Sequence, residues 1–150
     1  MLKNKKTVKI NKSNIKLYIS DSVFKPTATT SFLFRDAAKF INKKMDILDL
    51  GCGSGVIAIL ANKLQQNKKK IYASDVSSKA IQYAKKNLDM HKCDFELKKG
   101  SLFKPWNNKK FDLIINDVSG ISETLAKKST WFRNVPCRTG LDGTDLTLKV

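Results

Sequence analysis

The segment Asp49-Leu50-Gly51-Cys52-Gly53-Ser54-Gly55 restricts the fold of this chain more than any other. It follows a short apolar stretch, residues 45–50, that has the length and composition of a buried strand. Apolar residues with helical spacing come directly after it, at Ile57, Leu60, Ala61 and Leu64. Its glycines, at alternate positions, permit positive φ angles and a close approach between backbone and ligand. The segment therefore predicts a strand, a tight turn and a helix whose free N–H groups face a small molecule.

The same alternation of strand and helix continues along the chain. Short apolar stretches at 71–74, 95–97 and 111–116 have the character of strands. A helical face lies between the first two of them, formed by Ile81, Ala84 and Leu88. Strands that alternate with helices in this way form a parallel sheet with right-handed crossovers. We therefore expect an α/β protein with a Rossmann-like parallel sheet and helices on both faces.

Residues 1–44 have a different pattern. Apolar and polar residues alternate in 7–19 around Asn11-Lys12-Ser13-Asn14, which predicts a β-hairpin. A helical face follows, formed by Leu33, Ala37, Phe40 and Ile41. With 150 residues, the chain has the length of one domain rather than two. We therefore expect residues 1–44 to form a hairpin and a helix that pack on a ligand-binding core of residues 45–150.

Asp75 ends the strand expected at 71–74, roughly 20–25 residues after the glycine turn. A carboxylate at this position accepts the ribose hydroxyls of an adenosine ligand in nucleotide-binding folds. The glycine spacing here is G-x-G-x-G, whereas the dinucleotide pattern is G-x-G-x-x-G. The sequence therefore predicts an adenosine-containing ligand and fits a dinucleotide poorly.

The D-x-G-x-G-x-G pattern of Asp49, Gly51, Gly53 and Gly55 resembles motif I of the class I S-adenosylmethionine-dependent methyltransferases. The resemblance implies that S-adenosylmethionine is the cofactor. It also implies that the three glycines contact the methionine moiety of the cofactor, with Asp49 near its ammonium group. Asp75 is then the expected acceptor for the ribose hydroxyls.

Further segments are similar to the methyltransferase small-domain group, which includes the release-factor glutamine methyltransferases. These segments are residues 24–30, 99–103, 111–116 and 141–146. The resemblance implies transfer of a methyl group to a nitrogen atom of a protein or RNA acceptor. It also places Ser101 and Leu102 beside the adenine, although Ser101 stands where the group usually has Asp. Complete members have a seven-stranded sheet, so we expect the C-terminal strands of the core to be missing from this chain.

Residues 117–120 have the sequence DVSG, where the small-domain group has an N-P-P-Y motif. In that group, the Asn of the motif holds the nitrogen that is methylated. Asp117 takes the position of that Asn. A carboxylate accepts hydrogen bonds but does not donate them, which suits an acceptor that presents only N–H or O–H groups, such as an amine, a guanidine or a hydroxyl. Ser119 leaves more room than the residue it replaces. We expect Asp117 and Ser119 to be the catalytic residues that contact the acceptor; the alternative is that one of them only caps a helix at 121–125.

The formal net charge of +16 has two explanations that the sequence leaves open. One is a nucleic-acid or ribosome-associated partner. The other is an AT-rich genome, because lysine has AT-rich codons and arginine occurs only at Arg35, Arg133 and Arg138. Base-reading sites rely on arginine, so we expect no DNA readout. The charge also keeps a second function open, an inert methyltransferase-like module that binds RNA or a ribosomal protein.

The remaining candidate residues predict no further chemistry. No group of His, Cys, Asp or Glu has metal-ligand spacing, so we expect no metal site. His91 is expected at the surface near a helix end. Trp106 and Trp131 have two explanations, packing on the core or stacking on the acceptor. No stretch approaches the ~20 apolar residues that span a bilayer, so we expect a protein that does not enter a membrane. The cysteines form no disulfide pattern, which favours a cytoplasmic protein.

Overall fold

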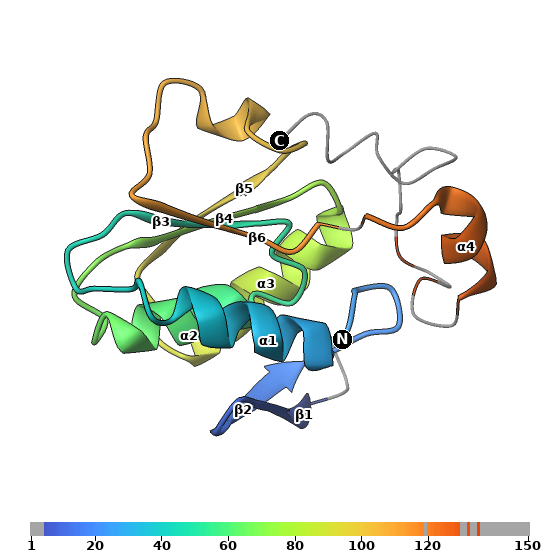
Figure 1. Ribbon diagram of the computed structural model, residues 1–150, viewed down its shortest axis with the longest axis horizontal. Coiled ribbons are helices and arrows are strands. Elements are labelled where there is room, and N and C mark those ends of the chain that lie inside the picture. The colour runs from blue at the N-terminus through green and yellow to red at the C-terminus, as the bar shows by residue number, and fades with distance from the viewer. Residues whose placement is uncertain (1–4, 119, 130–131, 133–134, 136–150) are drawn as a thin grey trace.

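The computed structural model describes residues 5–118, 120–129, 132 and 135 (Figure 1). Its N-terminal part is an antiparallel hairpin of β1 (Lys5–Ile10) and β2 (Ser13–Tyr18). The turn between them includes Asn11 with a φ of 53°, a left-handed conformation that asparagine adopts more readily than most residues. The hairpin expected at residues 7–19 is therefore confirmed.

The later strands of the described residues form a parallel sheet. They are β3 (Ile47–Leu50), β4 (Ile71–Asp75), β5 (Phe95–Lys99) and β6 (Leu113–Asn116). Their order is β5-β4-β3-β6, and every neighbouring pair is parallel. The chain moves outward from β3 to β4 and β5, and then returns to place β6 on the other side of β3. In open α/β sheets, ligands bind at the carboxyl ends of the strands where the order reverses, which here lies between β3 and β6.

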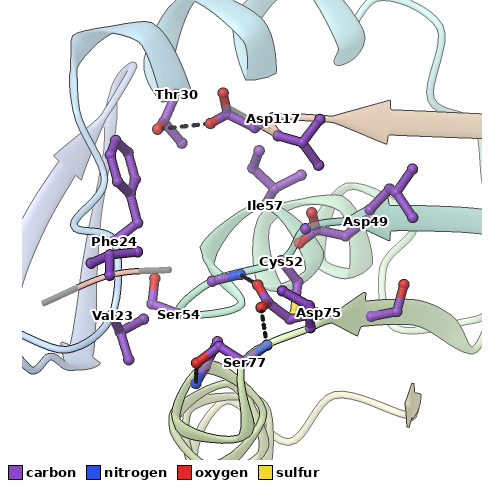
Figure 2. A pocket seen from close by; sticks show the side chains of 18 of the residues that line it. Val23, Phe24, Thr30, Asp49, Cys52, Ser54, Ile57, Asp75, Ser77 and Asp117 are labelled. Atoms are coloured by element: carbon purple, nitrogen blue, oxygen red, sulfur yellow. Dashed lines mark hydrogen bonds between the residues drawn. The ribbon is translucent and has the colours of Figure 1, made fainter. Parts of the chain in front are cut away.

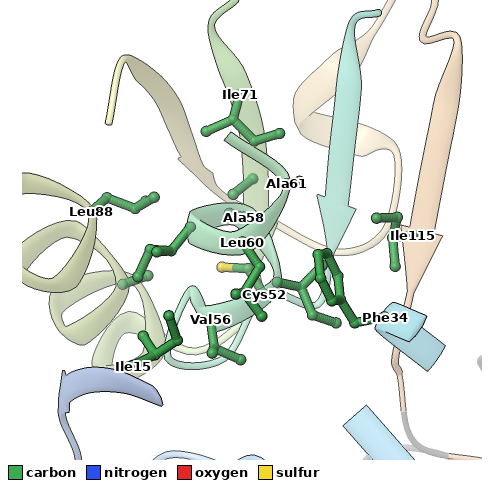
Figure 3. Packing of buried hydrophobic residues seen from close by; sticks show 14 of the residues in the cluster. Ile15, Phe34, Cys52, Val56, Ala58, Leu60, Ala61, Ile71, Leu88 and Ile115 are labelled. Carbon is green, nitrogen blue, oxygen red and sulfur yellow. The ribbon is translucent and has the colours of Figure 1, made fainter. Parts of the chain in front are cut away.

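Both faces of this sheet are covered, because successive strand residues point to opposite sides. The helices within the described residues are α1 (Ala28–Ala37), α2 (Val56–Leu64), α3 (Ser78–Met90), α4 (Glu123–Lys128) and the 3-10 helix η1 (Lys104–Trp106). Ile47 and Ile71 belong to the hydrophobic cluster of α1, α2 and α3, which lie together on one face (Figures 1 and 3). Leu48 and Tyr72 point to the other face, where η1 covers them. Helices on both faces were expected, and within the described residues the helix that covers the second face is the short 3-10 helix η1.

Asn87, a fully buried residue of α3, joins the hairpin to the core. Its side chain accepts a hydrogen bond from the Tyr18 amide at 2.7 Å and donates to the carbonyls of Tyr18 at 3.0 Å and Ser54 at 2.9 Å. The inner face of the hairpin enters the same hydrophobic cluster as α1, α2 and α3 through Ile10, Ile15 and Leu17. The hairpin thus packs on the core, while the division of the chain at residue 44 stays a prediction.

Trp106 belongs to the core, which decides between its two explanations in favour of packing. It is buried, and its Nε1–H donates a hydrogen bond to Ser74 Oγ at 2.9 Å.

Two expectations fall on residues outside the described part of the chain: those for Trp131 and for the segment 141–146. The expectation that C-terminal strands are missing also concerns that part, so it stays a prediction. None of the helices in the described ranges combines the length and apolar character needed to cross a bilayer.

Candidate functional site

A cavity of about 470 Å³ lies at the carboxyl ends of β3, β4 and β6 (Figure 2). The glycine turn and the ends of these strands form its floor, and residues 22–30 form one wall. Most of the site residues expected from the sequence line it: Asp49, Gly51, Gly53, Asp75, Ser101, Leu102 and Asp117. The cavity therefore occupies the place where the strand order predicts a ligand.

The end of β4 holds the glycine turn in place. The amides of Gly51 and Cys52 both donate to the carbonyl oxygen of Ser74, each at 2.9 Å. Gly51 has a φ of +75°, and a Cβ there would lie 2.8 Å from Cγ1 of Val118. Glycine is thus required at position 51 for its backbone conformation and for the close approach of the segment after β6.

Asp75 is bound to the glycine turn through its side chain. The Gly53 amide donates to Oδ2 at 2.9 Å, and the Ser77 amide donates to Oδ1 at 2.8 Å (Figure 2). Burial raises the pKa of this carboxyl group, and the amides of Ser77, Gly53 and Val76 act in the opposite direction. Each oxygen still has one acceptor position, because a carboxylate offers about four lone pairs in all. Asp75 can therefore accept two hydroxyl groups from a ligand.

Asp49 carries a buried polar atom for which the described residues provide no partner. Its side chain is almost fully buried; Oδ2 accepts the Ala58 amide of α2 at 2.9 Å, while Oδ1 has no hydrogen-bond partner. Burial, together with the charges of Asp117 and Asp75, raises the pKa of Asp49 to about 8. An unpaired buried oxygen is costly, so Oδ1 suits a cationic donor supplied from the cavity.

Asp117 follows β6 and is positioned by α1. Its Oδ2 accepts a hydrogen bond from Thr30 Oγ1 at 3.1 Å (Figure 2). Thr30 Oγ1 also accepts the Thr27 amide at 3.3 Å, as part of a capping box at the start of α1. Burial raises the pKa of Asp117, and the Thr30 bond lowers it in part.

The alternative that Asp117 or Ser119 caps the following helix is not supported. The N-cap of α4 is Ser122, whose Oγ accepts the Leu125 amide at 3.3 Å. Ser119 itself lies outside the described residues, so its contact with the acceptor stays a prediction.

Gly55 lies away from the other expected ligand residues and is not part of the cavity lining. It is the N-cap of α2 with a φ of 79°, and a Cβ there would lie 3.3 Å from Cα and Cβ of Ala84 in α3. The packing of α2 against α3 therefore explains this glycine. Its contact with a cofactor stays a prediction.

Ser101 and Leu102 reach the cavity from the end of β5. The Gly100 amide donates to the carbonyl oxygen of Asp75 at 3.0 Å, which keeps this segment beside the carboxylate. Leu102 has a φ of 46° and packs against the cluster that contains Trp106. The segment thus provides a hydroxyl group and an apolar side chain next to Asp75.

Sequence reasoning missed several residues that shape the site. Thr30, Ser74 and Val118 line the cavity, and none of them was identified as a site residue. The T-x-x-T spacing of Thr27 and Thr30 signals a helix start, but not the bond to Asp117. No local pattern marks Val118, because its role arises only from contact with Gly51.

Charge is distributed unevenly between this cavity and the rest of the chain. The net charge is +16, yet Asp49, Asp75 and Asp117 line the cavity, and no Lys or Arg occurs among its described lining residues. Carboxylates gathered in a partly desolvated space favour cationic ligands.

Comparison with known proteins identifies the family. The family model described as a methyltransferase domain matches residues 41–136. The chain is 35% identical over 97 residues to the ribosomal protein L11 methyltransferase of Thermosipho africanus, covering 65% of this chain and 35% of that protein. It is 30% identical over 126 residues to the release factor glutamine methyltransferase of Geobacter sulfurreducens, covering 83% of this chain and 44% of that protein. The chain thus spans less than half the length of these curated relatives.

Solved structures agree with this assignment. A ribosomal protein L11 methylase from Lactobacillus delbrueckii subsp. bulgaricus has a TM-score of 0.51 at 32% identity, covering 59% of this chain and 45% of that chain. A 16S rRNA N2 G1207 methyltransferase from T. thermophilus, in complex with AdoMet and guanosine, has a TM-score of 0.66 at 11% identity, covering 91% of this chain and 40% of that chain. The second likeness concerns the fold alone. The Rossmann-like fold and the resemblance expected from the sequence are confirmed, and the chain belongs to the methyltransferase domain family.

Proposed function

We propose that this chain binds S-adenosylmethionine and forms the cofactor-binding part of an enzyme that methylates a nitrogen atom of a protein or RNA acceptor. The observation that carries the proposal is the acidic cavity in a strongly basic chain, lined by Asp49, Asp75 and Asp117. S-adenosylmethionine has a sulfonium and an ammonium group, so this charge pattern suits it. A nicotinamide dinucleotide would bring an anionic pyrophosphate to the same carboxylates.

The residues present fit the cofactor at two points. Asp75 has two acceptor positions left after its bonds to the Gly53 and Ser77 amides, which matches the two hydroxyls of a ribose. Asp49 Oδ1 is buried and unpaired among the described residues, which matches the need of an ammonium group for an acceptor. Leu102 and Val76 add apolar walls near Asp75 for a planar base.

When bound, S-adenosylmethionine supplies a methyl group on a good leaving group, so the protein's contribution is positioning and desolvation. Asp117 lies at the end of β6 and is held by Thr30. As a carboxylate it accepts a hydrogen bond from an acceptor N–H and orients the nitrogen lone pair toward the cavity. Its raised pKa also allows it to take up the proton that the nitrogen loses.

An inert module that only binds RNA or a ribosomal protein explains less. Such a module has no need for a buried carboxylate oxygen beside a cavity, such as Asp49 Oδ1, that finds no partner among the described residues. Burial is the main cause of the raised pKa values of Asp49, Asp75 and Asp117, and the charges of Asp117 and Asp75 raise the pKa of Asp49 further, so ionising these carboxyl groups costs free energy. A cationic ligand offsets that cost.

Calorimetric titration of the chain with S-adenosylmethionine tests the proposal. We expect binding by the wild type, no binding of NADH, and a loss of about 1.5–3 kcal/mol in Asp75→Ala, because a charge-assisted hydrogen-bond acceptor is removed. Asp112→Ala is a control, because this aspartate lies away from the cavity lining and accepts the Asp46 amide. Binding of NADH without binding of S-adenosylmethionine would overturn the proposal.

A further inference from the structure

The outer face of the β1–β2 hairpin is a basic surface. The strand register places Lys5 opposite Tyr18, Thr7 opposite Lys16, and Lys9 opposite Asn14. These six residues, here called the outer hairpin face, lie on the side opposite Ile10, Ile15 and Leu17, because alternate strand residues face opposite sides. Five of them are exposed, and Tyr18, at the end of β2, is partly buried. The lysines are exposed, whereas the inner face is buried through Ile10, Ile15 and Leu17.

Among the described residues, no carboxylate pairs with the lysines of the outer hairpin face. The first acidic residue of the chain is Asp21. None of the three lysines forms an ion pair within the described part of the chain. The exposed carboxylates of Asp36 and Asp89 pair with basic residues close to them in sequence, not with the hairpin. Like charges gathered without counter-charges repel one another, and a polyanion relieves that repulsion.

An aromatic ring lies within this charge and connects it to the cavity. Nζ of Lys86 lies 3.8 Å from the centroid of the Tyr18 ring, and Nζ of Lys5 lies 5.3 Å from it. Tyr18 also packs against the cluster that contains Val23 and Ala80, and both of these line the cavity. The Tyr18 side chain therefore connects the basic surface to residues that line the cavity.

We propose that the outer hairpin face, with Lys86, binds the phosphate backbone of single-stranded RNA. Proteins that bind single-stranded nucleic acids combine basic side chains along the phosphates with aromatic rings beside them. The hairpin has no arginine to read bases in a DNA groove. Its aliphatic residues point inward, and the Tyr18 ring packs against the cluster of Val23 and Ala80, so the face has no aliphatic side chain to insert into a lipid surface. That this RNA carries or accompanies the methyl acceptor rests on the proposed function.

The test is binding of a fluorescein-labelled RNA of about 20 nucleotides, followed by anisotropy at ionic strengths from about 50 to 200 mM. Two variants of the whole chain with the same charge change are compared. Lys9→Gln/Lys16→Gln alters the outer hairpin face, and Lys43→Gln/Lys44→Gln alters exposed lysines before β3, at the end of the sheet opposite the cavity. The hairpin variant should lose affinity, and the slope of log K against log salt should become shallower by about 1.4, or roughly 0.7 for each lost contact. The control variant should keep the wild-type slope.

Equal losses of RNA affinity in both variants would overturn the proposal, because they would show an effect of net charge alone. Absence of RNA binding by the wild type at about 100 mM salt would also overturn it. The proposal would also be overturned if poly-glutamate or anionic lipid vesicles displaced the labelled RNA as effectively as unlabelled RNA does, because the surface would then bind polyanions in general. Titration of the same variants with S-adenosylmethionine separates the two proposals. If neither the wild type nor the two variants bind S-adenosylmethionine, but only the hairpin variant loses RNA affinity, the methyltransferase function is refuted and the RNA-binding surface is retained.

Discussion

Thr30 Oγ1 donates a hydrogen bond to Asp117 Oδ2 at 3.1 Å, across 87 positions of the chain. The same oxygen accepts the Thr27 amide at 3.3 Å. The start of α1 and the end of β6 are thus linked through one hydroxyl group. Because Asp117 is the proposed contact of the methyl acceptor, Thr30 is a positioning residue for it.

Thr30→Val should shift the pH dependence of methyl transfer. Removal of the hydroxyl donor takes away the interaction that lowers the pKa of Asp117, so the acidic limb of the rate profile should move to higher pH. The affinity for S-adenosylmethionine should remain within about twofold. Thr30→Ser keeps the hydroxyl and should restore the wild-type profile; a shift of equal size in the serine variant would contradict the role of the hydrogen bond.

Asp117→Asn should reduce methyl transfer by about tenfold or more, because the carboxylate that accepts from the acceptor nitrogen becomes an amide. Cofactor affinity should barely change, since Asp49 and Asp75 are intact. Single-turnover transfer and calorimetric binding, measured on the same sample, separate the two effects. Unchanged transfer, or loss of cofactor binding, would show that Asp117 does not serve the acceptor.

The affinity for S-adenosylmethionine should increase with pH up to about 8, the pKa of Asp49. Below that pKa the free protein holds a proton on Asp49, and a bound cation favours the carboxylate, so binding releases the proton. The affinity should then rise by up to roughly tenfold per pH unit between pH 6 and 8 and level off above this range. Titrations at several pH values measure the slope.

Asp49→Asn should remove this slope and weaken binding at pH 8 by about 1.5–3 kcal/mol, because a charged acceptor is lost. Asp75→Asn is the matched control: it should weaken binding and keep a slope with pH, but the slope should end at a lower pH, because the charge of Asp75 contributes to the raised pKa of Asp49. A slope that survives in the Asp49 variant would assign the released proton to another group.

Gly51→Ala should destabilise the fold for two separable reasons. The positive φ costs an alanine about 1–2 kcal/mol, and its Cβ would meet Val118 Cγ1 at 2.8 Å. Val118→Ala removes the second cause only, so the double variant should be more stable than the sum of the single variants predicts. Urea unfolding of all four proteins measures this coupling. Additive effects would show that Val118 does not press on the glycine turn.

Gly53→Ala is the comparison for that cycle. Its φ of +53° has a similar backbone cost, but the nearest atom to a Cβ there is the Phe24 carbonyl oxygen at an ordinary 3.8 Å. Its loss of stability should therefore be smaller than that of Gly51→Ala. It should also be independent of Val118.

The sequence by itself determined the strand, turn and helix around Asp49 and the acidic end of β4 at Asp75. Both depend on neighbours within a few residues, and backbone chirality leaves a parallel sheet as the arrangement for alternating strands and helices. Only the tertiary structure decided that Thr30 holds Asp117 and that Gly55 packs on Ala84. Such contacts join residues that are distant along the chain, and no local periodicity encodes them. The sequence likewise could not show that Asp49 Oδ1 lacks a partner in the described part of the chain, because this depends on which donors the packing brings near it.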